Sequence, residues 1–246
     1  MYQFFVKPEQ ICGKDIWITG SDVNHIKNVL RMKAGEEIAV SNGEDNKEYR
    51  CEIAEIGEDE IHCHLLFVKE DGLELPSKVY LFQGLPKADK MELIIQKAVE
   101  LGVYEVIPVA TKRAVVKLDE KKAKSKIARW QGISEAAAKQ SKRRVIPEIK
   151  EVMTFKQAIA YAESMDVKLI PYELAEGMQT TKEIVEGLLP GQSVAIFIGP
   201  EGGFEEAEIE AAMENGIKPI TLGKRILRTE TAGFTILSWI MYHLEM

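Results

Sequence analysis

Short apolar runs alternate with helical segments along the second half of the chain, and this alternation limits the possible folds more than any other feature. The runs cover residues 79–82, 106–109, 168–170, 194–198 and 219–222. They place apolar residues on both faces, which is typical of parallel strands that helices cover on each side. Between the first two runs, apolar residues at helical spacing end at Gly102, and glycine commonly terminates helices. The pattern predicts an α/β domain with a doubly wound parallel sheet.

The first part of the chain has a different pattern, made of short strand-like runs between turn residues. These runs cover residues 16–18, 37–40, 49–53 and 61–65. Asn42-Gly43 is a hairpin signal because both residues tolerate a positive φ. One helix interrupts the runs, with Ser21 as its expected N-cap. Its apolar face would consist of Val23, Ile26, Val29 and Leu30. We expect a small, mostly antiparallel β-barrel with one helix.

The two patterns meet at residues 70–76, a stretch that we interpret as a linker. The predicted domains are therefore 1–72 and 73–246. A chain of 246 residues, 46% of them hydrophobic, can bury a sufficient core without disulfides. Its three cysteines form no CxxC motif, and the N-terminus has no basic segment followed by an apolar run. The longest apolar stretch, near residues 234–244, is shorter than the roughly 20 residues of a membrane span. We expect a cytoplasmic globular protein without a membrane partner.

Positive charge is concentrated in one segment of an otherwise acidic chain. The net charge is −7, but residues 112–144 hold twelve Lys or Arg and three acidic residues, a balance of +9. Such a segment can neutralise phosphates and release their counterions, or it can be a solvated helix face. Trp130 within the segment and the closing run Lys142-Arg143-Arg144 favour RNA, because Arg suits bidentate phosphate contacts.

Ligands of open parallel sheets bind beyond the carboxyl ends of the strands, so the loops there are the candidate site. These loops cover residues 83–87, 111–113, 172–173, 199–204 and 223–232. Loop 199–204 matches neither GxGxxG nor GxxxxGK[ST], and the Glu201 carboxylate would repel phosphate. Its glycines allow close backbone approach to a flat ligand, so a nucleoside without phosphates fits better than ATP or NAD. The missing GxGxxG motif also disfavours a nucleotide-dependent oxidoreductase. The alternative is a tight strand-to-helix turn that Glu201 holds.

The segment 225–232 combines charged and apolar groups in a way that suits a nucleoside. Leu222, Ile226 and Leu227 would form apolar walls for a purine, while main-chain groups read its edge. Thr229 or Thr231 is expected to cap the last helix. The alternative is an internal Arg–Glu pair, formed by Arg225 or Arg228 with Glu230, that stabilises a loop.

The histidines offer little support for metal or hydrolytic chemistry. His62 and His64 lie on one predicted strand face, but no third ligand is near them, so no metal is expected. His25 and His243 lie on predicted helices without a Ser or Asp partner, which disfavours a hydrolase triad.

Six motifs, in this order and over nearly the whole chain, resemble those of the 16S rRNA uridine N3-methyltransferases of the SPOUT class. They are HIKNVLRMKAGE, LPKADKMELIIQKAVELG, TKRAVVKL, EAAAKQSKRR, IGPEGGF and LGKRILRTETA. The resemblance implies a PUA-like RNA-binding β-barrel at 1–72 and an α/β SPOUT methyltransferase domain with a trefoil knot at 73–246. It also implies S-adenosylmethionine as the methyl donor, a homodimer, and uridine 1498 of 16S rRNA in the 30S subunit as the substrate.

The same resemblance assigns site residues where the motifs match. The cofactor-binding residues would be Ile198, Gly199, Pro200, Glu201, Gly202, Leu222, Gly223, Ile226, Leu227, Arg228, Thr231 and Ala232. The RNA-binding residues would be Arg31, Lys87, Lys112, Arg113, Lys142, Arg143 and Arg144.

Uracil N3 holds its proton well above neutral pH, so methylation there needs proton removal or stabilisation of the anion. We hypothesise that Arg228 stabilises the anion near O2 or O4 and that Glu230 orients Arg228 or accepts the proton.

Two alternatives to this function stay open. One is a SPOUT enzyme that acts on tRNA or 23S rRNA, and the other is a non-catalytic rRNA-binding assembly factor.

Overall fold

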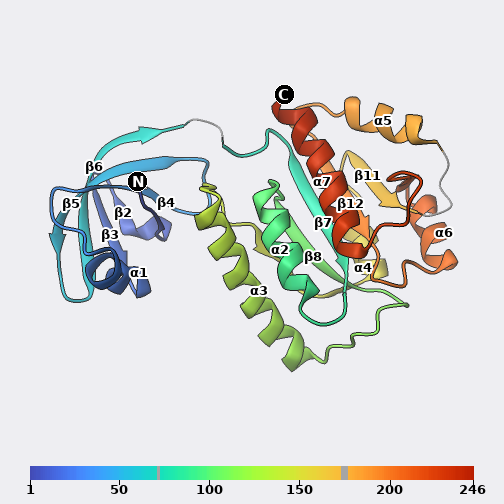
Figure 1. Ribbon diagram of the computed structural model, residues 1–246, viewed down its shortest axis with the longest axis horizontal. Helices are drawn as coiled ribbons and strands as arrows, with labels where there is room; N and C mark the ends of the chain where they lie inside the picture. The colour runs from blue at the N-terminus through green and yellow to red at the C-terminus, as the bar shows by residue number, and fades with distance from the viewer. Residues whose placement is uncertain (71–72, 173–176) are drawn as a thin grey trace. The chain divides into compact units, whose positions relative to one another are not determined.

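The computed structural model describes residues 1–70, 73–172 and 177–246 (Figure 1). Linker residues 71–72 and the predicted loop residue Glu173 lie outside the described residues. The chain divides into two compact units. The first comprises Met1–Glu74 and Ala138–Ile146, and the second comprises Leu75–Ala137 and Pro147–Met246.

The first unit is built on a curled six-stranded sheet with the order β1-β4-β5-β6-β3-β2 (Figure 1). Its strands are β1 (Gln3–Phe5), β2 (Ile11–Cys12), β3 (Asp15–Thr19), β4 (Glu37–Ser41), β5 (Glu48–Ile56) and β6 (Glu60–Lys69). Only β1 and β4 pair in parallel, and the other neighbours are antiparallel. The four predicted strand runs coincide with β3, β4, β5 and β6. Alternation explains the packing of β3, because Ile16 and Ile18 are fully buried while Trp17 between them is half-buried.

The helix of this unit differs from the prediction in its start and its pitch. Helix α1 (Ser21–Asn24) continues directly into the π-helical η2 (His25–Leu30). Gly20, at φ 75°, is the N-cap, so the expected capping by Ser21 is wrong. The wider π-helical turn changes the spacing of side chains, and Val29 is consequently 63% exposed although it was expected on the apolar face.

The Asn42-Gly43 hairpin is confirmed, with a longer connection than a two-residue turn. Strands β4 and β5 are antiparallel and are joined by residues 42–47. The Asn42 side-chain oxygen accepts hydrogen bonds from the N–H groups of Glu44 and Asp45, which folds the turn. The 138–146 segment lies beside this connection, because Ile146 N–H donates to the Gly43 carbonyl.

The second unit contains a sheet whose strand pairs are all parallel, with the order β10-β8-β7-β12-β11-β13 and with β9 beside β8. Its strands are β7 (Lys78–Gly84), β8 (Glu105–Ala110), β9 (Glu148–Ile149), β10 (Met153–Thr154), β11 (Val167–Pro171), β12 (Ser193–Ile198) and β13 (Lys218–Ile220). The five predicted runs are β7, β8, β11, β12 and β13, so the parallel sheet is confirmed.

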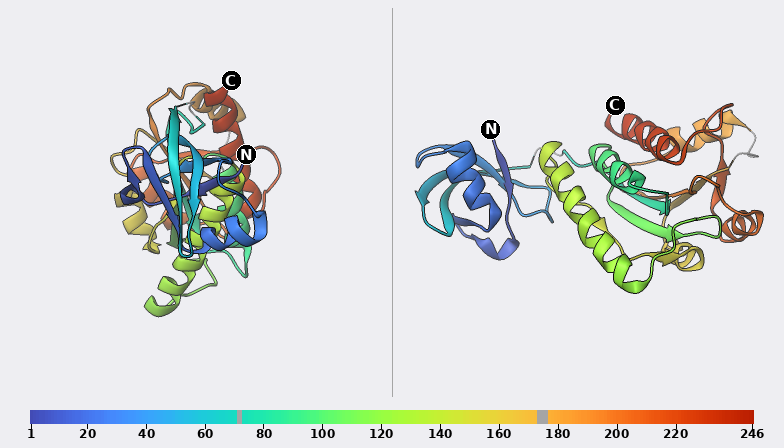
Figure 2. Two further views of the ribbon diagram at one scale, coloured as in Figure 1. Left: turned by 90° about the vertical axis from the view of Figure 1, so that its left-hand side faces the viewer. Right: turned by 60° about the horizontal axis from the view of Figure 1, so that its bottom comes forward.

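Helices cover both faces of this sheet. They are α2 (Lys90–Glu100), α3 (Glu120–Gln140), α4 (Phe155–Tyr161), α5 (Met178–Glu186), α6 (Glu206–Glu214) and α7 (Thr229–Glu245). Phe82 and Phe197 stack at 4.3 Å between ring centroids and share a buried cluster with residues of α4 and α6. The alternate residues Gln83 and Ile198 face Gly233 of α7. Helix α7 lies side by side with α2 (Figures 1 and 2).

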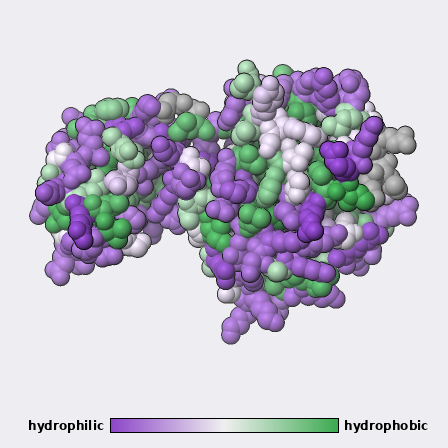
Figure 3. All heavy atoms as spheres, viewed as in Figure 1, coloured by the Kyte–Doolittle hydropathy of each residue, from purple (hydrophilic) through white to green (hydrophobic). Residues whose placement is uncertain are grey.

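Gly102 ends α2 as predicted. Its φ is 86°, its N–H donates to the Val99 carbonyl, and the next N–H donates to the Ala98 carbonyl. The face of the molecule in Figure 3 is largely hydrophilic, with hydrophobic residues gathered in patches. Within the described ranges, no helix combines the length and apolar character that crossing a membrane requires.

Candidate functional site

The carboxyl ends of β7 and β12 and the start of α7 meet at a buried hydrogen-bond network. Gln83, which is fully buried, donates from its side-chain amide to Thr229 Oγ at 2.8 Å. Thr229 Oγ in turn donates to the Gly199 carbonyl at 2.6 Å. The network therefore joins three of the loops that the sequence placed at one edge of the sheet.

The glycine-rich loop after β12 packs so closely that its neighbours have no room for side chains. A Cβ atom on Gly84 would lie 2.6 Å from Cδ of Pro200, and a Cβ atom on Gly199 would lie 3.0 Å from Cα of Gly203. Both distances are shorter than an ordinary contact between carbon atoms. Phe204 is buried at the end of the loop, where its ring packs against Phe155 at 5.4 Å. The loop is thus a tight strand-to-helix turn.

Glu201 holds this turn against the loop that follows β7. Its carboxylate accepts a hydrogen bond from the Lys87 N–H at 3.1 Å and pairs with Lys90 Nζ at 3.0 Å. Partial burial by itself would raise the pKa of Glu201, but its own backbone N–H, the Lys90 ammonium and the Lys87 N–H together hold that pKa below its ordinary value. The sequence left two interpretations of this loop open, a nucleoside site and a tight turn that Glu201 holds. The contacts of the Glu201 carboxylate are those of the tight turn.

Lys90 is a site residue that the sequence analysis missed. Its ammonium lies between two carboxylates, because Glu230 Oε2 is 3.5 Å away on its other side. The hydrogen bond to Glu201 is the main cause that raises the pKa of Lys90, so the side chain stays positively charged. One signal was present in the sequence: a lysine in the first turn of a helix opposes the helix dipole and needs a compensating partner.

The 222–232 segment runs from β13 into α7 and differs from two predictions. Arg228, in an extended conformation, is the N-cap of α7, so neither Thr229 nor Thr231 caps the helix. The Thr229 hydroxyl is used instead in the network with Gln83. Within the described chain, Glu230 forms its ion pair with Lys90, and the internal pair with Arg225 or Arg228 is absent.

The predicted cofactor-binding residues cover a range of exposures around these loops. Ile198 and Pro200 are buried, Gly199 is half-buried, and Glu201 and Gly202 are exposed. Leu222, Gly223, Leu227 and Ala232 are half-buried, and Ile226, Arg228 and Thr231 are exposed. Ile226 is 80% exposed, which is unusual for a large apolar side chain. The backbone N–H and C=O groups of Ile226 and Leu227 form no hydrogen bond within the described part of the chain.

Three predicted RNA-binding residues lie in the second unit, beyond the ends of β7 and β8. Lys87, Lys112 and Arg113 are exposed. Arg113 also donates a hydrogen bond to the Gly202 carbonyl at 3.0 Å, so it supports the glycine-rich loop. Lys112 is positioned through its backbone, because its N–H donates to Glu208 at 3.0 Å.

Arg143 and Arg144 are not available to RNA in this structure, and this corrects the prediction. Arg143 is 6% exposed and Arg144 is 3% exposed, both within the first unit. Arg143 Nε donates to Glu74 at 3.0 Å, and the Arg144 guanidinium pairs with Glu48. The glutamates are distant in sequence, so a count of local charge could not show that they neutralise the two arginines. Lys142 of the same unit is exposed.

Arg31 of the first unit is exposed and has a left-handed backbone at φ 54°. His62 pairs with Asp15 at 2.8 Å and stacks on Trp17, while His64 lies 4.0 Å from the same carboxylate. Over the described ranges, no three His, Cys, Asp or Glu residues are grouped to hold a metal ion.

Comparison with known protein families matches both parts of the chain. Residues 73–241 match the RNA methyltransferase domain, and residues 18–66 match the RNA methyltransferase PUA domain. The two matches lie in the order that the change of sequence pattern suggested.

Individual relatives cover nearly the full length. The ribosomal RNA small subunit methyltransferase E of Bacillus subtilis is 42% identical over 93% of this chain and 90% of that protein. The protein of the same name from Mesomycoplasma hyopneumoniae is 35% identical over 97% of this chain and 98% of that protein.

Solved structures agree with these relatives. A methyltransferase of Legionella pneumophila, in complex with the cofactor SAM, has a TM-score of 0.83 and 33% identity, and covers 98% of this chain and 96% of that chain. The ribosomal RNA small subunit methyltransferase E of Neisseria gonorrhoeae, bound to S-adenosyl methionine, has a TM-score of 0.82 and 29% identity, and covers 96% and 95%. This chain, with a mixed α/β methyltransferase domain and a PUA domain, belongs to the ribosomal RNA small subunit methyltransferase E family.

Proposed function

We propose that this protein transfers a methyl group from S-adenosylmethionine to N3 of uridine 1498 in 16S rRNA. The observation that carries the proposal is the meeting of three loops at Gln83, Gly199 and Thr229 in a chain of this family. The Legionella and Neisseria structures bind the same cofactor on this fold. The methylated position comes from the resemblance of the sequence motifs.

The residues beside these loops fit a nucleoside cofactor. The exposed Ile226 and the half-buried Leu227 offer an apolar wall, and their main-chain groups have no partner within the described residues. A ring packed on this wall could therefore be read by backbone hydrogen bonds. Cofactor-binding residues would be those of the 198–202 and 222–232 loops, with Glu201 acting through the turn that it holds. When bound, the cofactor supplies an electrophilic methyl group.

The charged side chains near the start of α7 would have different roles in the reaction. Arg228 is exposed and has no ion pair within the described residues, so its guanidinium is available to stabilise the negative charge that develops on uracil O2 or O4. Lys90 stays protonated and cannot accept the N3 proton. Glu230, held by Lys90, is the carboxylate that accepts this proton or orients Arg228. The remaining contribution is the alignment of N3 with the methyl group.

RNA would bind through exposed cations of both units. Lys87, Lys112 and Arg113 would contact phosphates near the site, and Arg31 and Lys142 would do so on the first unit. Arg143 and Arg144 are excluded from this surface by their burial. We place the RNA-binding PUA-like domain at 1–72 and the catalytic domain at 73–246, with 138–146 packed on the former.

We further propose a trefoil knot in the catalytic domain, a homodimer and a location in the cytoplasm. The knot and the dimer follow from the SPOUT resemblance. Two exposed apolar side chains on adjacent helices support the dimer: Leu93 of α2 is 44% exposed, and Tyr242 of α7 is 66% exposed. The 30S subunit is the proposed form of the substrate.

The test is methyl incorporation from labelled S-adenosylmethionine into 30S subunits, 50S subunits and total tRNA from cells that lack the protein. Label in 30S subunits alone, identified by mass as N3-methyluridine in 16S rRNA, is the expected result. Label in tRNA or 50S subunits would keep the cofactor and overturn the substrate. An absence of both label and cofactor binding would favour the RNA-binding assembly factor.

A further inference from the structure

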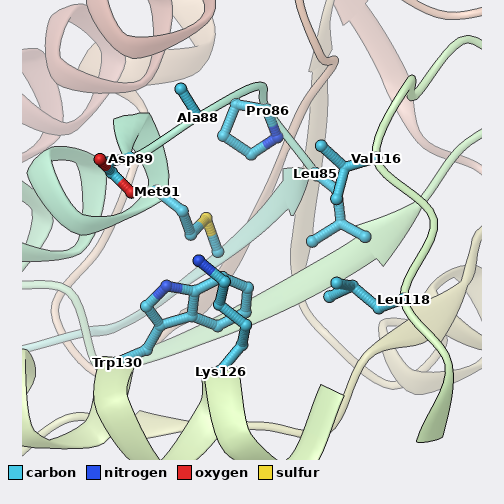
Figure 4. A pocket seen from close by; sticks show the side chains of 9 residues that line it. All are labelled: Leu85, Pro86, Ala88, Asp89, Met91, Val116, Leu118, Lys126 and Trp130. Atoms are coloured by element: carbon cyan, nitrogen blue, oxygen red, sulfur yellow. The ribbon is translucent and has the colours of Figure 1, made fainter. Parts of the chain in front are cut away.

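A small pocket lies beside the loop that joins β7 to α2 (Figure 4). Its volume is about 230 Å³. Leu85, Met91 and Leu118 supply apolar walls, and Trp130 of α3 forms one side. Asp89 and Lys126 add one acidic and one basic side chain to this lining. Trp130 is 4% exposed, so only an edge of its ring reaches the pocket, which therefore combines an apolar interior with two charged groups.

This pocket is distinct from the candidate cofactor site and is connected to it through the 85–89 segment. None of its lining residues belongs to the 198–202 or 222–232 loops. Its volume is below the roughly 300–1,000 Å³ of pockets that enclose drug-sized ligands, so it suits a single ring system. The 85–89 segment lines the pocket, and the same segment is bound to Glu201 through the Lys87 N–H. A ligand here would contact the segment that Glu201 of the glycine-rich loop holds.

The surroundings favour a nucleic-acid ligand. Lys126 is half-buried at the pocket and forms no ion pair within the described residues. It belongs to the 112–144 segment, whose balance is +9 in a chain of net charge −7. Cations of this kind bind phosphates, and unpaired RNA bases can be splayed out of their stack toward a protein. The Asp89 carboxylate can accept a hydrogen bond from an exocyclic amine or ring N–H.

We propose that this pocket binds one nucleobase of the RNA substrate, a neighbour of the reacting uridine in sequence, which enters between Leu85, Met91 and Leu118 while its phosphate approaches Lys126. The inference rests on the proposed function, because it takes rRNA as the substrate. An enzyme that modifies a base must take that base out of its stack, and a pocket for a neighbouring base would hold the strand in the opened form. Burial of roughly 50–100 Å² of a base among apolar side chains corresponds to about 8- to 70-fold in affinity.

The experiment couples a change in the pocket to a change in the RNA. Val116→Phe fills the pocket with a ring and keeps its charge, because Val116 is one of the lining residues. Val115→Phe is the matched control, since Val115 is 67% exposed and does not line the pocket. Each protein is bound to reconstituted 30S subunits that carry a single abasic nucleotide at one of the three positions on either side of the target uridine.

We expect Val116→Phe to weaken binding of unaltered 30S subunits about 8- to 70-fold. At one flanking position, the abasic nucleotide should weaken binding of the 30S subunit to the wild type and to Val115→Phe. The loss should be about as large as the loss that Val116→Phe causes with unaltered subunits. The same abasic nucleotide should have little further effect on binding to Val116→Phe. Lys126→Ala, compared with Lys121→Ala on the same helix, is a second variant pair in case the added ring disturbs folding. Lys126→Ala should lose more affinity although both remove one charge.

Two results would overturn the inference. One is the absence of coupling between Val116→Phe and every flanking position, together with equal losses in the two lysine variants. The other is weaker binding of S-adenosylmethionine to Val116→Phe in calorimetry, which would assign the pocket to the cofactor. Failure of the proposed function is a separate observation, because it appears as unmethylated wild-type 30S subunits whatever the binding data show.

Discussion

The Nζ atom of Lys90 lies 3.0 Å from Oε1 of Glu201, and this contact joins the first turn of α2 to the glycine-rich loop after β12. The same ammonium lies 3.5 Å from Glu230 Oε2 in the first turn of α7. One cation therefore holds two carboxylates that are distant in sequence, one in a loop and one at the start of a helix. Removal of that cation would leave the two carboxylates to repel each other.

Lys90→Met is expected to lower methyl transfer at least tenfold, because Glu201 and Glu230 lose the charge that positions them. Since the pair is near the surface, the melting temperature should change by less than about 3 °C. Lys97→Met on the same helix removes a lysine that pairs only with Glu100 in the described chain, so it serves as the control. Equal activity of the two variants in single-turnover assays on 30S subunits would contradict the role of Lys90.

The dependence of stability on pH tests the same contact. The pKa of Glu201 is lower in the folded protein than its ordinary value of 4.5. The contact therefore stabilises the fold above about pH 4.5 and is lost as the pH falls through the depressed pKa. The pKa of Lys90 is raised above its ordinary value of 10.5. The stabilisation that depends on the Lys90 charge is therefore present below pH 10.5 and is lost only as the pH rises through the raised pKa.

Glu201→Gln should accordingly unfold more easily than the wild type at pH 7, and the difference should shrink as the pH falls below about 4.5. Urea denaturation at a series of pH values measures it. A difference that stays constant over this range would show that the Glu201 charge does not contribute to the turn.

Arg228 and Arg225 allow a comparison within one segment, because both are exposed. Arg228→Ala is expected to lower kcat about 10²- to 10³-fold, the usual effect of removing a group that stabilises a developing anion. Arg225→Ala should change kcat much less and act mainly through RNA affinity. Measurement of kcat and KM on 30S subunits separates these effects. Similar losses of kcat in both variants would refute a specific role of Arg228.

The strands of both units could be predicted from the sequence because their signals are local. The apolar runs that became β7 and β12 are bounded by turn residues, and Gly102 marks the end of α2. Alternation along β3 likewise needs no distant information. The π-helical turn at His25–Leu30 gives no such signal, and the expected burial of Val29 was consequently wrong.

The site was predicted in outline and missed in its contacts. The loops were found because strand ends of a parallel sheet share one edge, and their meeting at Gln83 and Thr229 agrees with that rule. The partners of Lys90 and Arg143 were not found, because each pairs with a carboxylate from a distant part of the chain. A count of local charge gives the net charge of a segment. It does not show which cations of that segment are neutralised by carboxylates elsewhere in the fold.

The three cysteines should differ sharply in reactivity. Burial raises the pKa of both Cys51 and Cys63 to about 12, whereas Cys12 is exposed. A thiol reagent at pH 8 should therefore modify Cys12 alone in the folded protein and all three cysteines in denaturant. Mass spectrometry of the labelled protein counts the modifications. Rapid native labelling of Cys51 or Cys63 would contradict the packing of the first unit.

Adjacent residues Lys142 and Arg143 are expected to behave in opposite ways. Arg143→Ala removes the partner of Glu74 from a buried pair and should cost about 3–5 kcal/mol of stability. Lys142→Ala removes an exposed cation, so its stability should match the wild type. If Lys142 contacts a phosphate, the slope of log affinity for rRNA against log salt should become shallower by about 0.7 to 0.9. Urea denaturation and RNA binding at several salt concentrations measure the two effects. If Arg143→Ala were as stable as the wild type and had a reduced salt slope, Arg143 would be an RNA-binding residue and its structural role would be refuted.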